Sequence, residues 1–266
     1  SQAIFDENND FFESFSNCID KIEKEGDING IVLNLQNNKS INSYEVKKNL
    51  EEIDPVNCFK KVEIEKSILR RFETLDFPKV AILDGSIFNL IFELALCCNY
   101  RIALNDNNQK FGFTLINLGL MPGKGGMVRL SREIGIEQTL DFLLFEKSSN
   151  VKSLIEKGLL QNSADSLEEL TSLAESFINK NQKYNQPWDV KDYKIPGGVS
   201  YQNDNPSIIA DYSARIFKKN LRNYPVFEAI ISTVTEGASL SFDSASKIES
   251  RYYVELVTGD VSKILV

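Results

Sequence analysis

Residues 80–103, VAILDGSIFNLIFELALCCNYRIA, place two short strands on either side of a helix. Residues 80–83 are the mostly branched apolar run that is typical of a buried strand, and Asp84-Gly85 turns the chain after it. Residues 92–98 are apolar enough to form a core helix, and residues 100–104 indicate another strand. This alternation predicts an α/β domain.

The alternation continues in both directions from this stretch. Residues 5–24 carry apolar side chains at spacings of three and four, which predicts an amphipathic helix, and residues 28–35 indicate a further buried strand. Helical patterns follow at about residues 44–53 and 59–75. Downstream, residues 121–126 form a glycine-rich turn into a helix, and helical patterns continue to about residue 180.

The pattern of the second half of the sequence predicts how the whole chain is divided into domains. Residues 181–205 contain prolines and glycines and read as an extended linker, and three helical patterns follow at about 206–220, 224–238 and 241–257. We therefore expect an α/β core over residues 1–180, a linker over 181–205 and a helical C-terminal extension over 206–266. The sequence opens almost at once in a helical pattern, so we also expect that a first strand upstream is absent.

The composition excludes several classes of function. The 266 residues carry a formal net charge of −8, which disfavours attraction to nucleic acid or to anionic lipid. The chain has no histidine, which excludes Ser-His-Asp and Cys-His catalysis, and its four cysteines lack metal-binding spacing, so we predict no metal site. Acid–base chemistry must fall to Glu, Asp, Lys, Tyr or Cys. No targeting segment or membrane span is indicated, and we predict a cytoplasmic protein with no membrane partner.

An ordered series of motifs over about 55 residues resembles the enoyl-CoA hydratase/isomerase (crotonase) family. Residues 93–103 (ELALCCNYRIA) match that family's ELA-x-x-C-D-x-R-x-A segment. Residues 111–112 (FG) and 118–135 (LGLMPGKGGMVRLSREIG) match its FG-x-PE-x-x-LG-x-x-PG-x-GG-x-x-RL-x-R-x-x-G segment. The resemblance implies a crotonase-type ββα spiral with a helical C-terminal extension.

The flanking sequence is similar to a particular branch of that family. Residues 186–198 and 224–252 look like the hydratase part of multifunctional fatty-acid β-oxidation proteins, in which a 3-hydroxyacyl-CoA dehydrogenase domain follows. No GxGxxG fingerprint of such a domain occurs in this chain. The resemblance implies acyl-CoA as ligand, no cofactor besides the coenzyme A thioester, and as partners a dehydrogenase domain or a thiolase subunit within an oligomer.

The resemblance also assigns site residues, and it shows departures from the family pattern. Glu93 falls on the first of the family's two catalytic glutamates, whereas the second falls on Leu115. Leu90 stands at a glycine that supplies an N–H donor to the thioester oxygen, and Tyr44 at the other such donor. The glycine-rich turn with Gly123, Gly125 and Gly126 would lie beside the pocket.

Each of these assignments has a structural alternative. Glu93 could be a first-turn acid of a helix capped by Asn89, and the glycine-rich turn could serve only as a helix entry. Substitute acid–base groups and phosphate-binding lysines are also candidates, although such residues are more often surface or turn positions: Tyr44, Glu45 and Asp84 for proton transfer, and Lys39, Lys60 and Lys61 for the phosphates.

Three functional hypotheses remain open at this stage. The first is an acyl-CoA-binding domain with weak or lost hydratase activity, because leucine cannot transfer a proton. The second is an active hydratase or isomerase with relocated catalytic groups, and the third is a structural scaffold for oligomerisation. The sequence predicts that strands 30–35 and 80–83 are neighbours above a buried helix 90–98, with helices 206–257 outside. It also predicts a small apolar pocket crowded by four bulky residues: Leu90, Ile91, Leu115 and Tyr44.

Overall fold

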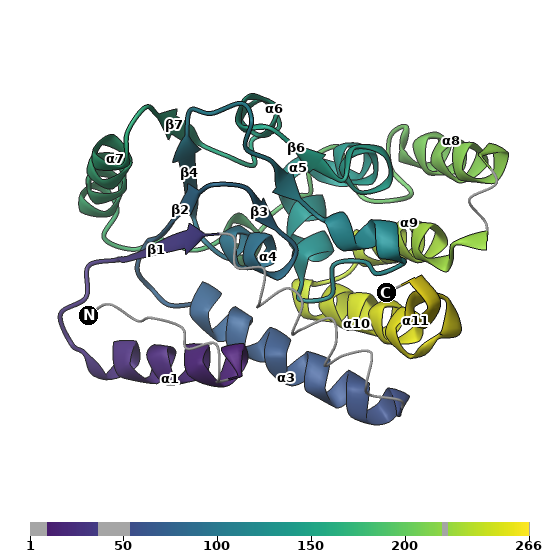
Figure 1. Ribbon diagram of the computed structural model, residues 1–266, viewed down its shortest axis with the longest axis horizontal. Helices are drawn as coiled ribbons and strands as arrows, with labels where there is room; N and C mark the ends of the chain where they lie inside the picture. The colour runs from purple at the N-terminus through teal and green to yellow at the C-terminus, as the bar shows by residue number, and fades with distance from the viewer. Residues whose placement is uncertain (1–9, 37–53, 220–222, 266) are drawn as a thin grey trace.

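A four-stranded parallel sheet organises the computed structural model, which describes residues 10–36, 54–219 and 223–265 (Figure 1). Its strands lie in the order β1 (Ile31–Gln36), β2 (Lys79–Asp84), β4 (Tyr100–Leu104) and β7 (Asn162–Ala164). Strands β1 and β2 pair in parallel with Val32 opposite Val80. The predicted adjacency of these two strands is therefore confirmed.

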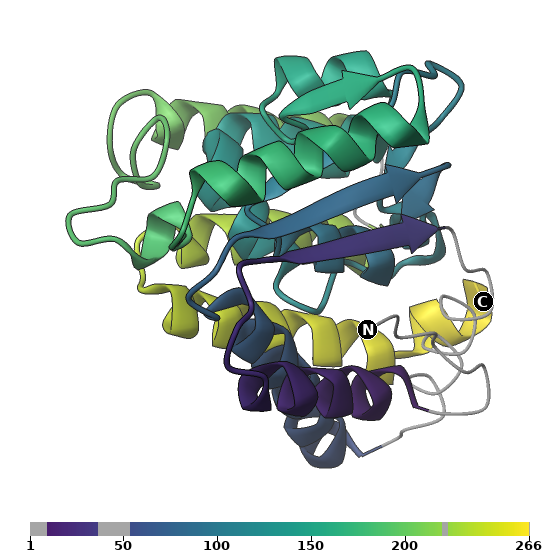
Figure 2. The same ribbon diagram turned by 90° about the vertical axis from the view of Figure 1, so that its left-hand side faces the viewer.

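Strand β2 is covered on both faces. Its residues Ala81 and Leu83 belong to the main hydrophobic core, whereas Val80 and Ile82 pack into a second cluster with Leu170 of helix α7 (Leu167–Lys180). Successive side chains of a strand point to opposite faces, so an unbroken apolar run requires cover on each side. Figure 2 shows α7 on one side of the sheet, and α1 (Phe11–Lys24) and α3 (Pro55–Glu73) on the other.

A second, smaller sheet contains the strand that precedes the buried helix. It contains β3 (Ile87–Phe88), β5 (Phe111–Gly112) and β6 (Ser148–Ser149), with β3 and β5 parallel and β5 and β6 antiparallel. Helix α4 (Leu90–Leu96) follows β3 at once, and every one of its residues is buried. The prediction of a core helix here is confirmed, although α4 ends two residues sooner than its apolar run.

Helix α3 begins earlier than its apolar periodicity predicts. Asp54 accepts a hydrogen bond from the backbone N–H of Val56 at 3.0 Å, and Pro55 occupies the first helical turn. Aspartate at the cap and proline at the first turn start a helix without any apolar residue. The predicted start near residue 59 is therefore wrong by about one turn, and the helix predicted over 44–53 lies outside the described residues.

Helices α5 (Gly126–Asp141), α9 (Pro225–Gly237) and α10 (Phe242–Thr258) form the second half of the fold with α6 (Val151–Glu156), α8 (Asn205–Lys218) and α11 (Asp260–Leu265). Helices α9 and α10 pack against α5, and α10 also contacts α3. Buried residues of the C-terminal helices, such as Ile230 and Val257, share one hydrophobic cluster with the α/β core. The remaining short helices are η1 (Thr114–Leu118), η2 (Phe142–Glu146) and η3 (Pro187–Asp189).

Across the three described ranges, none of the helices combines the length and apolar character that a membrane span needs.

Candidate functional site

The carboxylate of Glu93 lies against the glycine-rich loop that opens helix α5. One oxygen accepts from the N–H of Gly123 at 3.3 Å, and the other accepts from the N–H groups of Lys124 at 2.7 Å and Gly126 at 2.8 Å. Glu93 is 3% exposed. A carboxylate at a helix N-terminus is stabilised by the unpaired N–H groups and by the helix dipole. Glu93 stands in the first turn of α4, and its side chain caps the start of α5.

Asn89 stands at the start of α4 but does not cap it with its side chain. Its carboxamide oxygen accepts from the N–H of Leu115 at 3.2 Å, and its amide nitrogen bonds the hydroxyl of Thr114 at 3.2 Å. The backbone at Asn89 has a φ of 54°, which is uncommon for a residue other than glycine. Asn89 is thus the N-cap residue of α4, as predicted, but its side chain makes no capping hydrogen bond and instead fastens the segment with Leu115 to the entry of α4.

The structure brings Leu90, Glu93, Leu115 and Gly123 to the wall of one small cavity. Its other lining residues are mostly apolar: Asn89, Phe113, Leu120, Met121, Pro122 and Tyr253. The volume is about 20 Å³. A single water molecule needs on the order of 10–15 Å³ of such space, so the cavity has room for about one water. Ile91 is buried but does not line the cavity.

Tyr253, on helix α10, forms one wall of the cavity. A Cβ atom built on Gly123 would lie 2.3 Å from its ring. Glycine is therefore required at residue 123 by the close approach of a ring from the far end of the chain. Sequence reasoning missed Tyr253 because it treated α10 only as an outer helix.

Glu249, also on α10, holds the other N–H groups of the same loop. Its carboxylate is fully buried and accepts from Gly125 at 2.5 Å, Met127 at 3.1 Å and Val128 at 3.2 Å. Glu93 and Glu249 together therefore satisfy six successive backbone donors from residue 123 to residue 128. Glu249 and Tyr253 are four residues apart on one helix and so share a face, which is the one signal that could have revealed both.

Three buried ion pairs connect helix α3 to this loop, to α5 and to α10. They join Glu65 to Lys124 at 2.6 Å, Lys66 to Glu249 at 3.3 Å and Glu73 to Arg129 at 2.8 Å. Burial lowers the pKa of Lys66, and the charge of Glu249 opposes that shift. Charges in such a site are tolerated because each has a partner of opposite sign. The loop geometry is thus fixed by side chains from α3, α4 and α10.

The cysteines near the site are poor candidates for nucleophiles. Cys97 and Cys98 are fully buried, and the Cys97 thiol donates to the carbonyl of Glu93 at 3.4 Å. Burial raises the pKa of both thiols, to about 12 for Cys98. A thiol must ionise to react, so these two side chains do not supply acid–base or nucleophilic chemistry near neutral pH.

The other sequence candidates lie away from the cavity or beyond the described residues. Asp84, at the end of β2, accepts from the side chain of Gln36 at 2.7 Å and does not line the cavity. Lys60 is exposed on α3 at a separate groove, and Lys61 is half-buried beside it. Three candidates lie outside the described residues: Lys39, Tyr44 and Glu45.

Comparisons with known proteins agree with this fold. Residues 8–186 match the family described as enoyl-CoA hydratase/isomerase. The fatty acid oxidation complex subunit alpha of Vibrio parahaemolyticus is 27% identical over 202 residues, which covers 75% of this chain and 28% of that protein. The subunit of the same name from a Shewanella species is 29% identical over 199 residues, with 74% and 28% covered. The chain therefore spans about 28% of the length of these relatives.

Solved structures show the same architecture. An enoyl-CoA hydratase from Mycobacterium smegmatis has a TM-score of 0.60 at 12% identity. The match covers 98% of this chain and 79% of the hydratase chain. An enoyl-CoA hydratase from Bacillus halodurans has a TM-score of 0.56 at 20% identity, with 91% and 87% covered. The parallel sheet, the buried helix and the glycine-rich loop are those of a crotonase fold, and the chain belongs to the enoyl-CoA hydratase/isomerase family.

Proposed function

We propose that this chain is an acyl-CoA-binding crotonase-type domain of a fatty-acid β-oxidation protein, and that its hydratase activity is weak or lost. The observation that carries the second part is the cavity at Glu93, which measures about 20 Å³ and is faced by Leu115. A thioester group is several times larger than one water. The reactive end of an acyl-CoA therefore has no room beside the carboxylate.

The hydrogen bonds of Glu93 argue in the same direction. Hydration, as the family resemblance describes it, needs one group to activate water and another to deliver a proton. Both oxygens of Glu93 are engaged by backbone N–H groups, and Leu115 has no proton to exchange. Loss of one positioned acid–base group lowers a rate by about 10²–10⁴-fold.

A second, larger groove supports the binding of acyl-CoA. It lies between the start of α3 and the end of α10 and has a volume of about 790 Å³. Val56, Phe59 and Val254 give it apolar walls. Its charged lining residues are two cations, Lys60 and Arg251, and one carboxylate, Glu255, which leaves one positive charge in excess. An apolar slot with cations suits an acyl chain that is joined to phosphates.

A hydration assay tests the activity. We expect loss of the enoyl-thioester absorbance of crotonyl-CoA to be at least about 10²-fold slower than with a relative that carries both glutamates, since one proton-transfer group is missing. A rate comparable to that of the relative would refute the proposal and would favour relocated catalytic groups.

A binding assay tests the ligand. Calorimetric titration with hexanoyl-CoA should give saturable binding, and the double substitution Lys60→Gln and Arg251→Gln should weaken it. Lys180→Gln, at the exposed end of α7, is the matched control and should bind as the parent does. Absence of binding to the parent protein would favour the scaffold hypothesis, which the small cavity at Glu93 also supports.

The partners and location follow from the same proposal. The relatives from Vibrio and Shewanella are named as subunits of a fatty acid oxidation complex. We accordingly expect a 3-hydroxyacyl-CoA dehydrogenase domain or a thiolase subunit as partner, an oligomeric assembly, and a cytoplasmic location. Co-purification of the full-length protein with its partners would test this expectation.

A further inference from the structure

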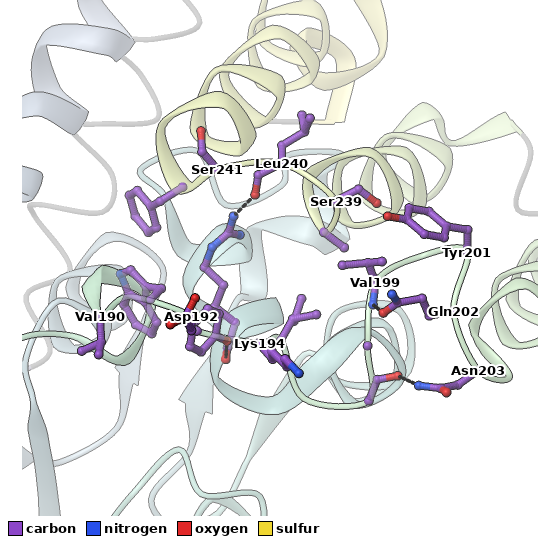
Figure 3. Close-up of a pocket in the computed structure, with 18 residues that line it drawn as sticks. Val190, Asp192, Lys194, Val199, Tyr201, Gln202, Asn203, Ser239, Leu240 and Ser241 are labelled. Carbon is purple, nitrogen blue, oxygen red and sulfur yellow. Dashed lines mark hydrogen bonds between the residues drawn. The ribbon is translucent and has the colours of Figure 1, made fainter.

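A separate cavity of about 750 Å³ lies between residues 188–203 and the turn that joins α9 to α10 (Figure 3). It shares no lining residue with the cavity at Glu93. Small-molecule sites typically measure about 300–1,000 Å³ and combine apolar walls with a few polar groups. Val190, Val199 and Leu240 provide apolar surface here, and Figure 3 shows Lys194 and Asp192 among the polar side chains.

Arg132 of helix α5 lines this cavity as a buried cation. It is 5% exposed, and its guanidinium donates to the carbonyls of Val128 at 3.4 Å and Leu240 at 2.9 Å. Within the described ranges no carboxylate forms an ion pair with this guanidinium. Asp189, whose charge acts on Arg132, is hydrogen-bonded to Arg70 instead. A guanidinium has five N–H donors and, when buried, normally has an anionic partner. Burial lowers the pKa of Arg132, and the charges of Glu249 and Asp189 oppose that shift without forming an ion pair with it.

Trp188 lines the same cavity. Its indole Nε1 is buried, and no hydrogen-bond acceptor meets it among the residues that the structure describes. Its ring stacks on Phe242 with centroids 6.0 Å apart, which keeps the indole in place. The indole is therefore a fixed part of the cavity wall, and its fluorescence can report on what the cavity holds.

The charges that line the cavity leave one positive charge in excess. Arg132 and Lys194 are its cations, and Asp192 is the one carboxylate among its described lining residues. A monoanion would balance this charge, whereas a phosphate dianion would exceed it.

We propose that this cavity binds a small organic monoanion, with its carboxylate on Arg132 and its apolar body against Val190, Val199 and Leu240. Carboxylate oxygens accept two N–H groups from one guanidinium side by side, which gives this pairing its geometric specificity. The site is distinct from the acyl-CoA groove of the proposed function.

Fluorescence offers a direct test, because Trp188 is the single tryptophan of the chain. Hexanoate should change the emission in a saturable way, whereas hexanol, with the same chain and no charge, should have no effect in the same range. Arg132→Met should weaken hexanoate binding at least about 10-fold, since hydrogen bonds to charged groups contribute about 1.5–3 kcal/mol. Arg215→Gln, on the exposed surface of α8, is the control and should bind as the parent does.

Further measurements keep the test decisive if Arg132→Met fails to fold. Lys194→Gln changes an exposed side chain and should weaken binding to a smaller extent, and hexanoate should raise the melting temperature of the parent protein. Equal responses to hexanoate and hexanol, no response to millimolar hexanoate, or tighter binding of inorganic phosphate would each overturn the proposal. None of these results affects the acyl-CoA measurement, since Arg132 and Lys194 lie outside that groove.

Discussion

The substitution Glu249→Gln should strongly destabilise the protein, although it changes neither the size nor the shape of the side chain. Glu249 is fully buried, accepts three backbone N–H groups and lies 3.3 Å from the ammonium of Lys66. The amide nitrogen of glutamine would face N–H donors, and Lys66 would lose its counter-charge. Removal of one member of a buried ion pair costs about 3–5 kcal/mol, which is a large part of the about 5–15 kcal/mol that stabilise a typical protein.

Urea unfolding, followed by circular dichroism and by Trp188 fluorescence, measures this loss. Glu255→Gln makes the same change on the exposed face of α10 and should leave the unfolding free energy unchanged. The double variant Lys66→Met with Glu249→Gln should lose less unfolding free energy than the two single variants together. We expect the difference to be at least about 1 kcal/mol, since the two charges interact directly. A loss below about 1 kcal/mol for Glu249→Gln would refute the argument that this carboxylate holds the loop.

Three further predictions concern the cavity at Glu93 and Tyr193, a lining residue of the other cavity whose hydroxyl donates to the carbonyl of Arg132. Leu115→Glu alone should not restore crotonyl-CoA hydration, because Leu90 and Tyr253 still close the cavity; turnover near that of an active relative would show that the pocket is open. Gly123→Ala should reduce the unfolding free energy by about 1–3 kcal/mol through overpacking against the Tyr253 ring, and Tyr253→Ala in the same chain should relieve most of that added strain. Burial raises the pKa of Tyr193 to about 12, whereas an unfolded tyrosine ionises near pH 10, so the unfolded state loses its proton first and stability should fall as the pH rises from 10 to 12. In Tyr193→Phe, the measured decline of the unfolding free energy over that range should be shallower.

Local sequence patterns predicted the elements whose structure depends on nearby residues. The branched apolar run of β2 predicts a strand with cover on both faces, and the structure has it so. The same prediction for residues 28–35 is wrong for one face, because β1 lies at the end of the described strand order with Val32 exposed, and only its other face, with Leu35, is turned to the core. The apolar run of α4 likewise indicates a core helix. The start of α3 was missed because periodicity ignores a cap and a proline, and both were legible in Asp54 and Pro55.

The candidate site was only partly predictable, because its geometry depends on distant residues. The motif placed Glu93 beside the glycine-rich loop, and the structure has them in direct contact. It could not show that Glu249, which bonds a backbone group 124 positions away, shares that loop. Nor could it show that the Asn89 side chain would turn to the N–H of Leu115. Such contacts follow from how helices pack and not from spacing along the chain.

The attachment of the loop to α10 has a consequence for the motions of the native protein. Opening of α10 would withdraw a carboxylate and an aromatic ring from the loop at the same moment, and would leave the N–H groups of Gly125, Met127 and Val128 without acceptors. The amides of the loop and those of α10 should therefore exchange with deuterium as one group, with a common free energy of opening. Two segments more than 100 residues apart would then behave as a single cooperative unit of local unfolding.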